Sequence, residues 1–480
     1  IPVTEDGLTL PVTEVLAGRG FITGKSGSGK SILEGTPVYT DEGRKPIEDV
    51  REGERVLSLN KQSYDQEFRE VLATIEHEAD DLLKITLEDG TELVGTEDHS
   101  FLTVRDLEIV PIKGSDLEEG TWLPRSRQLP ATETVDQIDL AEYIIPANNV
   151  IVRESEIQSG PAVADRYLDL TFESGKVLGL YLAEGSLSSH YTVQISNVDE
   201  DVKEFLGTQN FKVYEKTANR AFKAFGEFVR QEFGTGSAHK RIPQWVFNAP
   251  KEFKAGLISG NFDGDGTVND CDVTVLSKSP DLIRGIKELL RHFGISSTIR
   301  EKMVLSGEER VKFERLTVDS FSLDRFMEVV DLSVTAKSRK LTDVNRALAD
   351  GGQYNAKDMV PNFGPVLNNA ASERGWTKRE SGNRAGAASI HQHTRKQKVG
   401  RGTLNRILAD LDVEGRLKQY ANSDIQWKRV SSVEPLEETG RVYDLDVAVN
   451  DNFIANGVFV HNSNSASVVI EELLENNFAV

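Results

Sequence analysis

A glycine-rich pattern that could bind ATP phosphates lies near the start of the chain. Residues 24–31 read GKSGSGKS and fit G-x-x-x-x-G-K-[ST], so Gly24, Gly29 and Lys30 would cradle the phosphates. Such a loop needs a helix directly after it, because the helix N-terminus completes the anion site. A glycine and a proline follow within a few residues instead, at Gly35 and Pro37, and they argue against a helix.

The missing helix pattern lies at the other end of the chain. After Asn462, residues 463–474 read SNSASVVIEELL, which is small, then apolar, then acidic. Joining Lys30 to Ser463 restores a phosphate loop with its helix, and Ser463 then supplies the hydroxyl that binds Mg²⁺. Residues 31–462 therefore interrupt another protein, and we expect the interrupted chain to hydrolyse no ATP.

Several polar residues near these junctions form a recognisable set. Thr96 and His99 make a T-x-x-H arrangement after a run of short strands, and residues 442–445 read VYDL with an acid at Asp444. The segment ends in an apolar strand pattern with an Asn-Gly turn, followed by His461, Asn462 and Ser463. Taken singly, each is an ordinary strand end. Together with the restored phosphate loop, they resemble the motifs of an intein, a self-excising protein-splicing element of the Hint fold.

The resemblance implies a splicing reaction that needs no cofactor. Ser31 would attack the Lys30 carbonyl and turn the amide into an ester. A hydroxyl is a weak nucleophile, so it needs a nearby base or a polarised amide. His99 would protonate or polarise that amide, with Thr96 orienting it.

The remaining steps involve the C-terminal residues. Ser463 would take over the ester, and Asn462 would cyclise on its own carbonyl with help from His461. The ester would then rearrange to an amide. One departure from the family is Asp451, which stands where many members have His. The resemblance implies either that branch formation or Asn462 cyclisation is slower, or that Asp444 and His461 perform the role of that His.

The hydrophobic pattern predicts the elements that position these residues. Alternating strands with tight turns occupy the stretch after Ser31 and resume near Ile425, around a long middle of different composition. We expect a mixed fold: an all-β, horseshoe-like Hint domain split by an α+β insertion. The predicted segments are a host fragment at 1–30, Hint parts at 31–135 and 425–462, an endonuclease at 150–345, an insert at 346–424 and a second host fragment at 463–480.

The middle segment contains two similar helical patterns. Residues 177–185 read VLGLYLAEG and residues 257–266 read LISGNFDGDG, each with small residues before an acid. Small residues let two helices pack closely and bring Glu184 and Asp265 together. Alone, the first copy could be a buried helix and the second a plain turn or calcium loop. As a pair they resemble LAGLIDADG homing endonucleases.

This second resemblance implies a monomeric nuclease that cuts double-stranded DNA. Glu184 and Asp265 would hold Mg²⁺ as oxygen ligands. Lys240 and Lys337 lie where the family has basic residues that stabilise charge or orient water, although a solvated surface lysine is the alternative for each. Glu184 replaces the more usual Asp, and Asn261 is a polar residue in the second helix.

Composition limits the remaining possibilities. The net charge of −21 requires any DNA contact to use local basic patches, and it resembles the acidic surfaces of haloarchaeal proteins. Residues 371–408 form a basic island, which suits either phosphate contact or a flexible surface segment. With one Cys, no signal sequence and no membrane-spanning run, we expect a cytoplasmic protein.

The identity of the interrupted protein and the state of the nuclease stay open. The rejoined flanks resemble the nucleotide site of translocase-type P-loop ATPases. Two alternatives remain: a P-loop ATPase that works with a large inserted domain, and a splicing element whose endonuclease is inactive.

Overall fold

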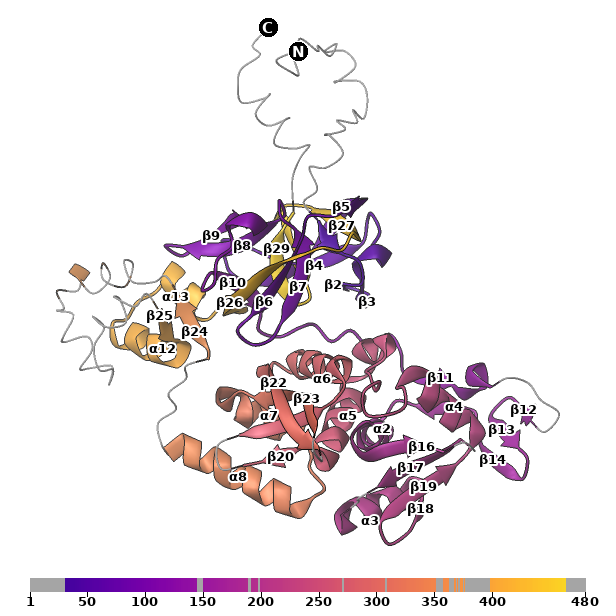
Figure 1. Ribbon diagram of the computed structural model, residues 1–480. Helices are drawn as coiled ribbons and strands as arrows, with labels where there is room; N and C mark the ends of the chain where they lie inside the picture. The colour runs from indigo at the N-terminus through magenta and orange to yellow at the C-terminus, as the bar shows by residue number, and fades with distance from the viewer. Residues whose placement is uncertain are drawn as a thin grey trace, which may run out of the picture.

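The computed structural model describes residues 31–144, 150–188, 191–196, 199–269, 272–306, 309–350, 357–361 and 398–462, with a few isolated residues between 367 and 375. Residues 1–30 and 463–480, the two expected host fragments, lie outside the described residues together with Gly24, Gly29, Lys30 and Ser463. Most of the expected basic island lies outside them as well. Two larger units make up the described chain (Figure 1), and we call them the β unit and the α+β unit. Within the described part, no helix is long and apolar enough to cross a membrane.

The β unit is one sheet of 14 strands drawn from both ends of the described chain. Strand β26 pairs with β6 and β10, and β27 pairs with β1 and β5, so the C-terminal segment is woven into the N-terminal one. The strands are β1 (Ile32–Leu33), β2 (Pro37–Thr40), β3 (Gly43–Pro46), β4 (Arg55–Leu59), β5 (Gln66–Ala79), β6 (Leu82–Leu87), β7 (Glu92–Thr96), β8 (Ser100–Arg105), β9 (Glu108–Lys113), β10 (Trp122–Ser126), β26 (Ile425–Leu436), β27 (Gly440–Val447), β28 (Asn452–Ala455) and β29 (Val458–His461).

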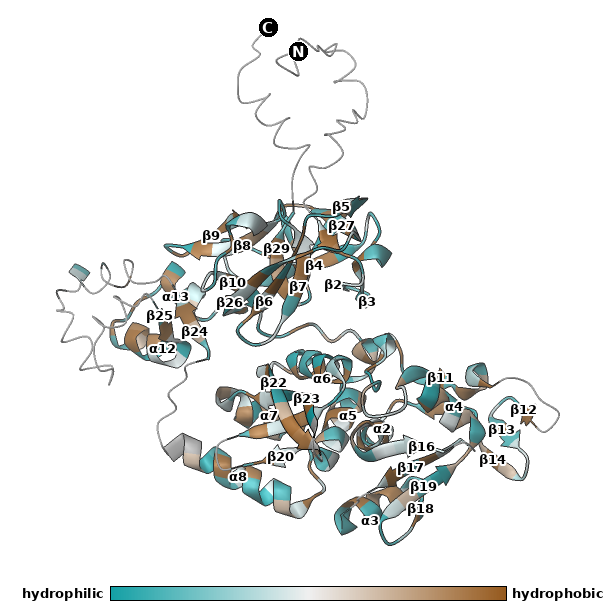
Figure 2. Ribbon diagram, viewed as in Figure 1, coloured by the Kyte–Doolittle hydropathy of each residue, from teal (hydrophilic) through white to brown (hydrophobic). Residues whose placement is uncertain are grey.

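Alternating side chains give the β unit its core. Figure 2 shows hydrophobic residues interspersed with hydrophilic ones along these strands. In β7, for example, Leu93 and Gly95 are buried while Val94 between them is only partly so, as expected when successive side chains point to opposite faces. Leu93 packs in one core with Ile32, Phe101 and Val460. The strand that begins at Ser31 and the strand that ends before Asn462 therefore share a core.

A small substructure lies against the β unit. It consists of β24 (Met359–Pro361), β25 (Lys398–Gly400), α12 (Arg401–Asp410) and α13 (Arg416–Ala421). Its Leu404 and Tyr420 are buried in the same hydrophobic core as Trp427 of β26. The expectation of a basic surface in residues 371–408 does not hold for Arg401. Its guanidinium is buried, pairs with Asp358 and donates to the carbonyls of Ala421 and Ile425, so it is not exposed to contact a DNA phosphate.

The α+β unit, residues 137–350, contains an internal repeat. Each copy runs helix, two strands, helix, two strands, helix, and the sheet orders β16-β17-β19-β18 and β20-β21-β23-β22 match. The first copy is α2 (Phe172–Glu184), β16 (Gly185–Leu187), β17 (Thr192–Ser196), α3 (Glu200–Thr208), β18 (Lys212–Val213), β19 (Thr217–Ala221) and α4 (Lys223–Glu232). The second is α5 (Lys251–Gly264), β20 (Thr267–Val268), β21 (Val273–Ser277), α6 (Pro280–His292), β22 (Ser297–Ser306), β23 (Glu309–Val318) and α7 (Leu323–Val329).

Two further groups complete this unit. Helix α8 (Thr335–Asp350) follows the second copy. Before the first copy come β11 (Gln137–Asp139), β12 (Val150–Val152), β13 (Glu156–Ser159), β14 (Ala162–Asp165) and β15 (Tyr167–Asp169). The expected mixed architecture, an all-β unit split by an α+β unit, is confirmed.

Helices α2 and α5 touch backbone to backbone at the centre of the repeat (Figure 1). A Cβ added at Gly179 would lie 2.1 Å from the carbonyl oxygen of Leu257, and one at Gly260 would lie 2.1 Å from that of Lys176. Gly175 and Gly256 make the same kind of contact one helical turn earlier. Only glycine fits at these four positions, and the buried Asn261 is accommodated without separating the helices.

Gly260→Ala is predicted to force the two helices apart, since its methyl group would meet backbone atoms that cannot rotate away. We expect a loss of about 3 kcal/mol in unfolding free energy, typical of overpacking, measured as a lower urea midpoint. Gly207→Ala in α3 is the matched control, because its nearest contact would be an ordinary 3.8 Å from Val213. Equal midpoints for the two variants would contradict the close helix contact.

Candidate functional site: two splice-end residues and a carboxylate pair

The nucleophile candidate Ser31 is held at the start of β1 by Thr96. The Ser31 backbone N–H donates to the Thr96 hydroxyl at 3.1 Å, and the Thr96 N–H donates to the Ser31 carbonyl at 2.9 Å. Ser31 is 1% exposed, and its Oγ has no hydrogen-bond partner among the described residues. The amide nitrogen at the expected scissile bond is therefore already engaged by a hydroxyl.

Glycines and a tight turn bring His99 close to this point. The His99 N–H donates to the Thr96 carbonyl at 3.0 Å, so the T-x-x-H segment closes as a turn. The His99 ring is fully buried and meets Phe101 edge to face at 5.0 Å. A Cβ on Gly95 would lie 3.1 Å from the Ser31 carbonyl oxygen. Glycine at this position lets β1 pass close to β7.

Strand β27 lies on the other side of β1. Ile32 pairs with Tyr443, so the same register continued by one residue sets Ser31 opposite Asp444. Asp444 is 3% exposed, and its carboxylate accepts the Leu445 N–H at 3.0 Å. The structure therefore sets Ser31 between Thr96 on one neighbouring strand and Asp444 on the other.

The other end of the segment reaches the same strand. The Asn462 side-chain nitrogen, Nδ2, donates to the Asp446 carboxylate at 3.2 Å, and its backbone N–H donates to the Asp451 carbonyl at 3.1 Å. Asn462 is fully buried. Asp446 was not among the residues predicted from sequence, although Asp444-Leu445-Asp446 has the two-residue spacing that puts both acids on one face of a strand.

Asp451 and His461 flank Asn462. Asp451 has a left-handed backbone (φ 51°), and its carboxylate lies 4.0 Å from the Lys61 ammonium. His461 pairs with Asn452 across the final hairpin, and its ring is partly exposed. Burial raises the pKa of Asp446, and the Asp451 carboxylate raises it further against the opposing bond from Asn462.

The two acids of the helical repeat meet at the ends of α2 and α5. Glu184 ends α2, Asp265 caps α5, and a Cβ on Gly264 would lie 3.4 Å from the Glu184 side chain. Burial raises the pKa of Asp265 to about 6, with Glu184 adding to the shift and Lys240 and Lys337 opposing it. Burial alone disfavours the charged form of this carboxyl, and the charge of Glu184 disfavours it further.

Lys240 and Lys337 occupy matching positions in the two copies. The Lys240 ammonium donates to the carbonyls of Tyr181, Leu182 and Ala183 at 2.8, 3.0 and 3.3 Å. The Lys337 ammonium does the same at α5, to Phe262, Asp263 and Gly264 at 3.1, 2.5 and 3.0 Å. Each ammonium thus sits at the negative end of a helix, beside the acid of its own repeat.

A buried ion pair links helices α2 and α5. Lys176 of α2 lies 3.1 Å from Asp263 of α5, and both side chains are at most 3% exposed. Asp263 also accepts the N–H groups of Ser333 and Val334, just before α8. These contacts fix the segment that carries Lys337, and the sequence analysis did not single out either charge.

The donor set at Glu184 and Asp265 fits a hard divalent cation. Two carboxylates are the protein share that Mg²⁺ ordinarily takes when substrate phosphates supply further oxygens. Across the described residues, no cluster of three or more His, Cys, Asp or Glu side chains is arranged to hold a metal.

Helix α6 fastens the α+β unit to the β unit through buried charge. Lys287 lies 3.2 Å from the Asp89 carboxylate, which also pairs with Arg125. Arg291 donates to the carbonyl of Gly457 at 3.0 Å, in the turn between β28 and β29. Burial lowers the pKa of Lys287 well below its usual value, and nearby Arg125 lowers it further.

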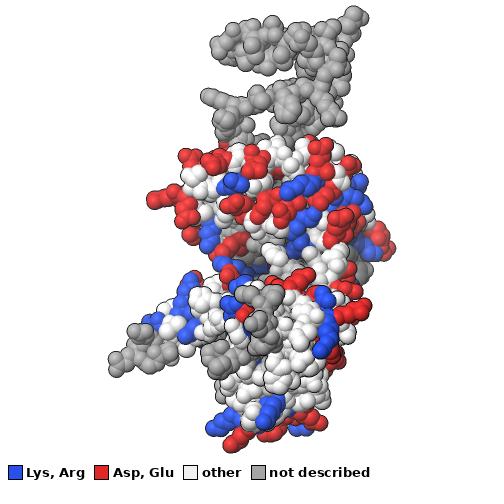
Figure 3. Space-filling view, turned by 90° about the vertical axis from the view of Figure 1, so that its right-hand side faces the viewer, with Lys and Arg blue, Asp and Glu red and all other residues white. Residues whose placement is uncertain are grey.

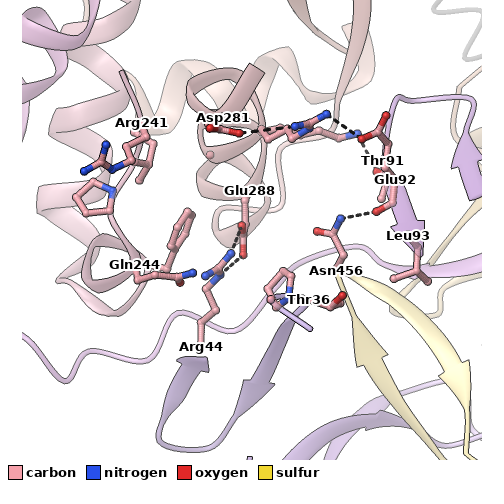
Figure 4. Close-up of a pocket in the computed structure, with 18 of the residues that line it drawn as sticks. Thr36, Arg44, Thr91, Glu92, Leu93, Arg241, Gln244, Asp281, Glu288 and Asn456 are labelled. Atoms are coloured by element: carbon pink, nitrogen blue, oxygen red, sulfur yellow. Dashed lines mark hydrogen bonds and ion pairs between the residues drawn. The ribbon is translucent and has the colours of Figure 1, made fainter. Parts of the chain in front are cut away.

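A cavity of about 1020 Å³ lies beside this contact, lined by residues of both units. Figure 4 shows Arg44 of the β unit paired with Glu288 of α6, and the two side chains are 2.6 Å apart. Arg284 of α6 donates to the Glu92 carboxylate at 2.8 Å. Asn456 donates to the Glu92 carbonyl at 2.6 Å on the same wall. Ion pairs across the cavity therefore bridge α6 and the β unit.

Comparison with known proteins identifies a family that matches this chain. The family model for the intein splicing domain matches residues 37–462. The chain is 29% identical over 433 residues to the RNA polymerase subunit Rpo1C of Methanocaldococcus jannaschii, covering 82% of this chain and 48% of that protein. The chain thus spans about half the length of that relative.

Two solved structures are each similar to part of the chain. A bacterial intein-like domain from Clostridium thermocellum is 30% identical, over 20% of this chain and 65% of that one, with a TM-score of 0.18. The I-DmoI variant in complex with its target DNA is 11% identical, over 34% of this chain and 96% of that one, with a TM-score of 0.27. The family match decides the class: this chain belongs to the intein splicing domain family.

Asp89→Ala is predicted to destabilise the docking of the two units. It would leave Arg125 and Lys287 buried without their carboxylate, which costs about 3–5 kcal/mol for a buried pair. The readout is the urea midpoint. Asp98→Ala is the control, since Asp98 and Lys113 are half exposed and 3.6 Å apart, and we expect less than about 1 kcal/mol there. Equal losses would contradict the buried network.

Proposed function

We propose that residues 31–462 excise themselves and join Lys30 to Ser463. The observation that carries this proposal is that both segment ends lie next to one strand, β27. Ser31 precedes β1, whose register with β27 continues to Asp444, and Asn462 Nδ2 donates to Asp446. Splicing needs both ends in one site, because the ester formed at the first junction must reach the second. Effective concentrations within such a site replace a bimolecular encounter.

Three residues act in the first step, the attack of Ser31 on the Lys30 carbonyl. The Thr96 hydroxyl engages the Ser31 nitrogen, which becomes the leaving amine when Ser31 Oγ attacks the Lys30 carbonyl. His99 donates the proton that this amine needs, from its buried place in the same turn. The buried Ser31 hydroxyl is kept from bulk water, which favours attack over hydrolysis.

The second junction then completes the reaction. Ser463 takes the 1–30 segment onto its oxygen, and Asn462 cyclises to cut its own peptide bond, with His461 beside it. The final ester rearranges to an amide without further catalysis. The joined flanks carry Gly24, Gly29, Lys30 and Ser463 in one phosphate loop, which supports a P-loop ATPase of the translocase type as the host and ATP with Mg²⁺ as its ligands.

We further propose that the α+β unit is a homing endonuclease that cuts double-stranded DNA as a monomer with Mg²⁺. Glu184 and Asp265 would hold the cation, which neutralises charge that develops on the phosphate during cleavage. Lys240 and Lys337 hold the helix ends in place and keep two positive charges beside the acids. Each acid leads directly into the first strand of its own sheet, so a duplex lying along both sheets would pass over the pair.

The second sheet offers a surface for phosphates. Arg300 and Arg315 are directly opposite each other on β22 and β23, a like-charge pair that is unfavourable without an anion. Lys302 extends the row from the same strand face. Elsewhere the surface is crowded with acids: Figure 3 shows Asp and Glu side chains gathered over the β unit on the face in view. Such a surface would keep DNA on the sheets of the α+β unit.

Splicing is tested by mass on the purified chain after incubation. We expect separate species for residues 31–462 and for 1–30 joined to 463–480. Ser31→Ala removes the hydroxyl that must attack Lys30, so it should leave no joined product. Release of unjoined flanks by the wild type would indicate cleavage alone, and an unchanged chain that binds ATP would instead support an ATPase with an inserted domain.

DNA cleavage is tested on the host gene without residues 31–462, with Mg²⁺ added. Asp265→Asn should reduce cutting by at least about 100-fold, because one of two cation ligands is lost. Asp281→Asn is the control, because Asp281 is an exposed acid of α6 that is not an expected cation ligand. A wild type that splices but cuts no such DNA would support an inactive endonuclease.

Cation binding should also depend on pH. With the Asp265 pKa raised to about 6, its carboxyl is protonated below that pH and ionised above it. We expect Mn²⁺ affinity, measured by calorimetry, to fall about tenfold per pH unit below 6, since the ligand must lose its proton. An affinity that is flat between pH 5 and 7.5 would contradict Asp265 as a ligand.

A further inference from the structure

The Asn462 side chain has one polar contact that bears directly on its chemistry. Its Nδ2 donates to Asp446 Oδ1 at 3.2 Å, and its backbone N–H donates to the Asp451 carbonyl at 3.1 Å. Nδ2 is the atom that must attack during cyclisation. A carboxylate therefore touches the reacting nitrogen before the reaction begins.

An amide nitrogen is a poor nucleophile because its lone pair is delocalised into the carbonyl group. As it attacks, the nitrogen gains positive charge and its proton becomes acidic, so a base within hydrogen-bond distance lowers the barrier. Family members often have His at the position of Asp451, and this chain lacks it. Asp451 offers its backbone carbonyl to Asn462, and its carboxylate faces Lys61.

We propose that Asp446 is the general base of Asn462 cyclisation. This inference rests on the proposed splicing function and names the residue that drives its C-terminal step. It differs from the expectation from sequence, in which Asp444 and His461 assist the cyclisation of Asn462. By strand register Asp444 lies opposite Ser31, and its carboxylate accepts the Leu445 N–H.

Cyclisation makes one bond, breaks one bond and moves one proton. Nδ2 forms a bond to the Asn462 carbonyl carbon and passes one proton to Asp446. The bond from that carbon to the Ser463 nitrogen then breaks, and Asp446 returns the proton to the departing amine. The products are an aminosuccinimide at residue 462 and a free amine on Ser463, with no oxidant, water or cofactor consumed.

The surroundings suit this role. Burial and Asp451 raise the pKa of Asp446, which makes its carboxylate a stronger base than an exposed one. Other titratable groups around the Asn462–Asp446 contact include the Asp451–Lys61 pair, His461 directly before Asn462, and Asp444 two residues before Asp446 on β27. Lys61 is ion-paired to Asp451, so it does not neutralise Asp446 directly.

The test follows each junction separately in Asp446→Asn. We expect C-terminal cleavage to slow by about 100-fold, the usual contribution of a general base, while the branched ester between residues 1–30 and Ser463 accumulates. Hydroxylamine should still release residues 1–30 at the wild-type rate, since the first step uses other residues. Asp446→Glu should recover part of the lost rate, because it restores a carboxylate.

Two readouts separate catalysis from structure. The wild-type cyclisation rate should rise with pH as Asp446 ionises, and Asp446→Asn should lose that rise. Glu76→Gln on the neighbouring strand β5 is the matched control, because Glu76 is exposed beside Arg441 and should splice at the wild-type rate.

The outcomes are distinguishable. Asp446→Asn that cyclises as fast as the wild type, or that also loses the hydroxylamine-sensitive ester, overturns the role of Asp446 while splicing stands. A wild-type chain that releases neither flank overturns the splicing proposal and this inference together.

Discussion

The pairing of β1 with β27 is the contact on which the β unit depends for its chemistry. Strand β1 has only two residues, yet it is hydrogen-bonded on both sides, to β7 and to β27. Because β27 comes from the far end of the chain, closing this pair carries a large loop entropy. The cores shared by Ile32, Phe101 and Val460 offset that entropy through apolar burial.

A different constraint organises the α+β unit. Four glycines let α2 and α5 meet at backbone distance, and the contact sets the spacing of Glu184 and Asp265. The lysines then act as caps, each filling the carbonyl end of one helix. Charge that would be unfavourable at a helix C-terminus is thus balanced by an ammonium from the same repeat. In both copies of the repeat, therefore, a lysine ammonium lies at the negative end of the helix that carries the acid.

Much of this arrangement could be predicted from sequence, for identifiable reasons. Strand alternation, the paired helix patterns and the residues at both junctions are local signals, and the mixed fold they indicated is confirmed. Asp446 was missed because only the register of β27 against the chain end reveals its partner. The network of Asp89, Arg125 and Lys287 was missed because those charges are distant in sequence and look like ordinary surface residues there.

The docking of α6 has an evolutionary consequence. Arg291 holds the Gly457 turn that leads to Asn462, and Lys287 neutralises Asp89 inside the β unit. A lineage that lost the insertion would expose that carboxylate and free the final hairpin. The stability of the β unit would then favour retention of α6, whatever the α+β unit does. A shortened descendant would need compensating substitutions at Asp89 and Arg125, and these would record the loss.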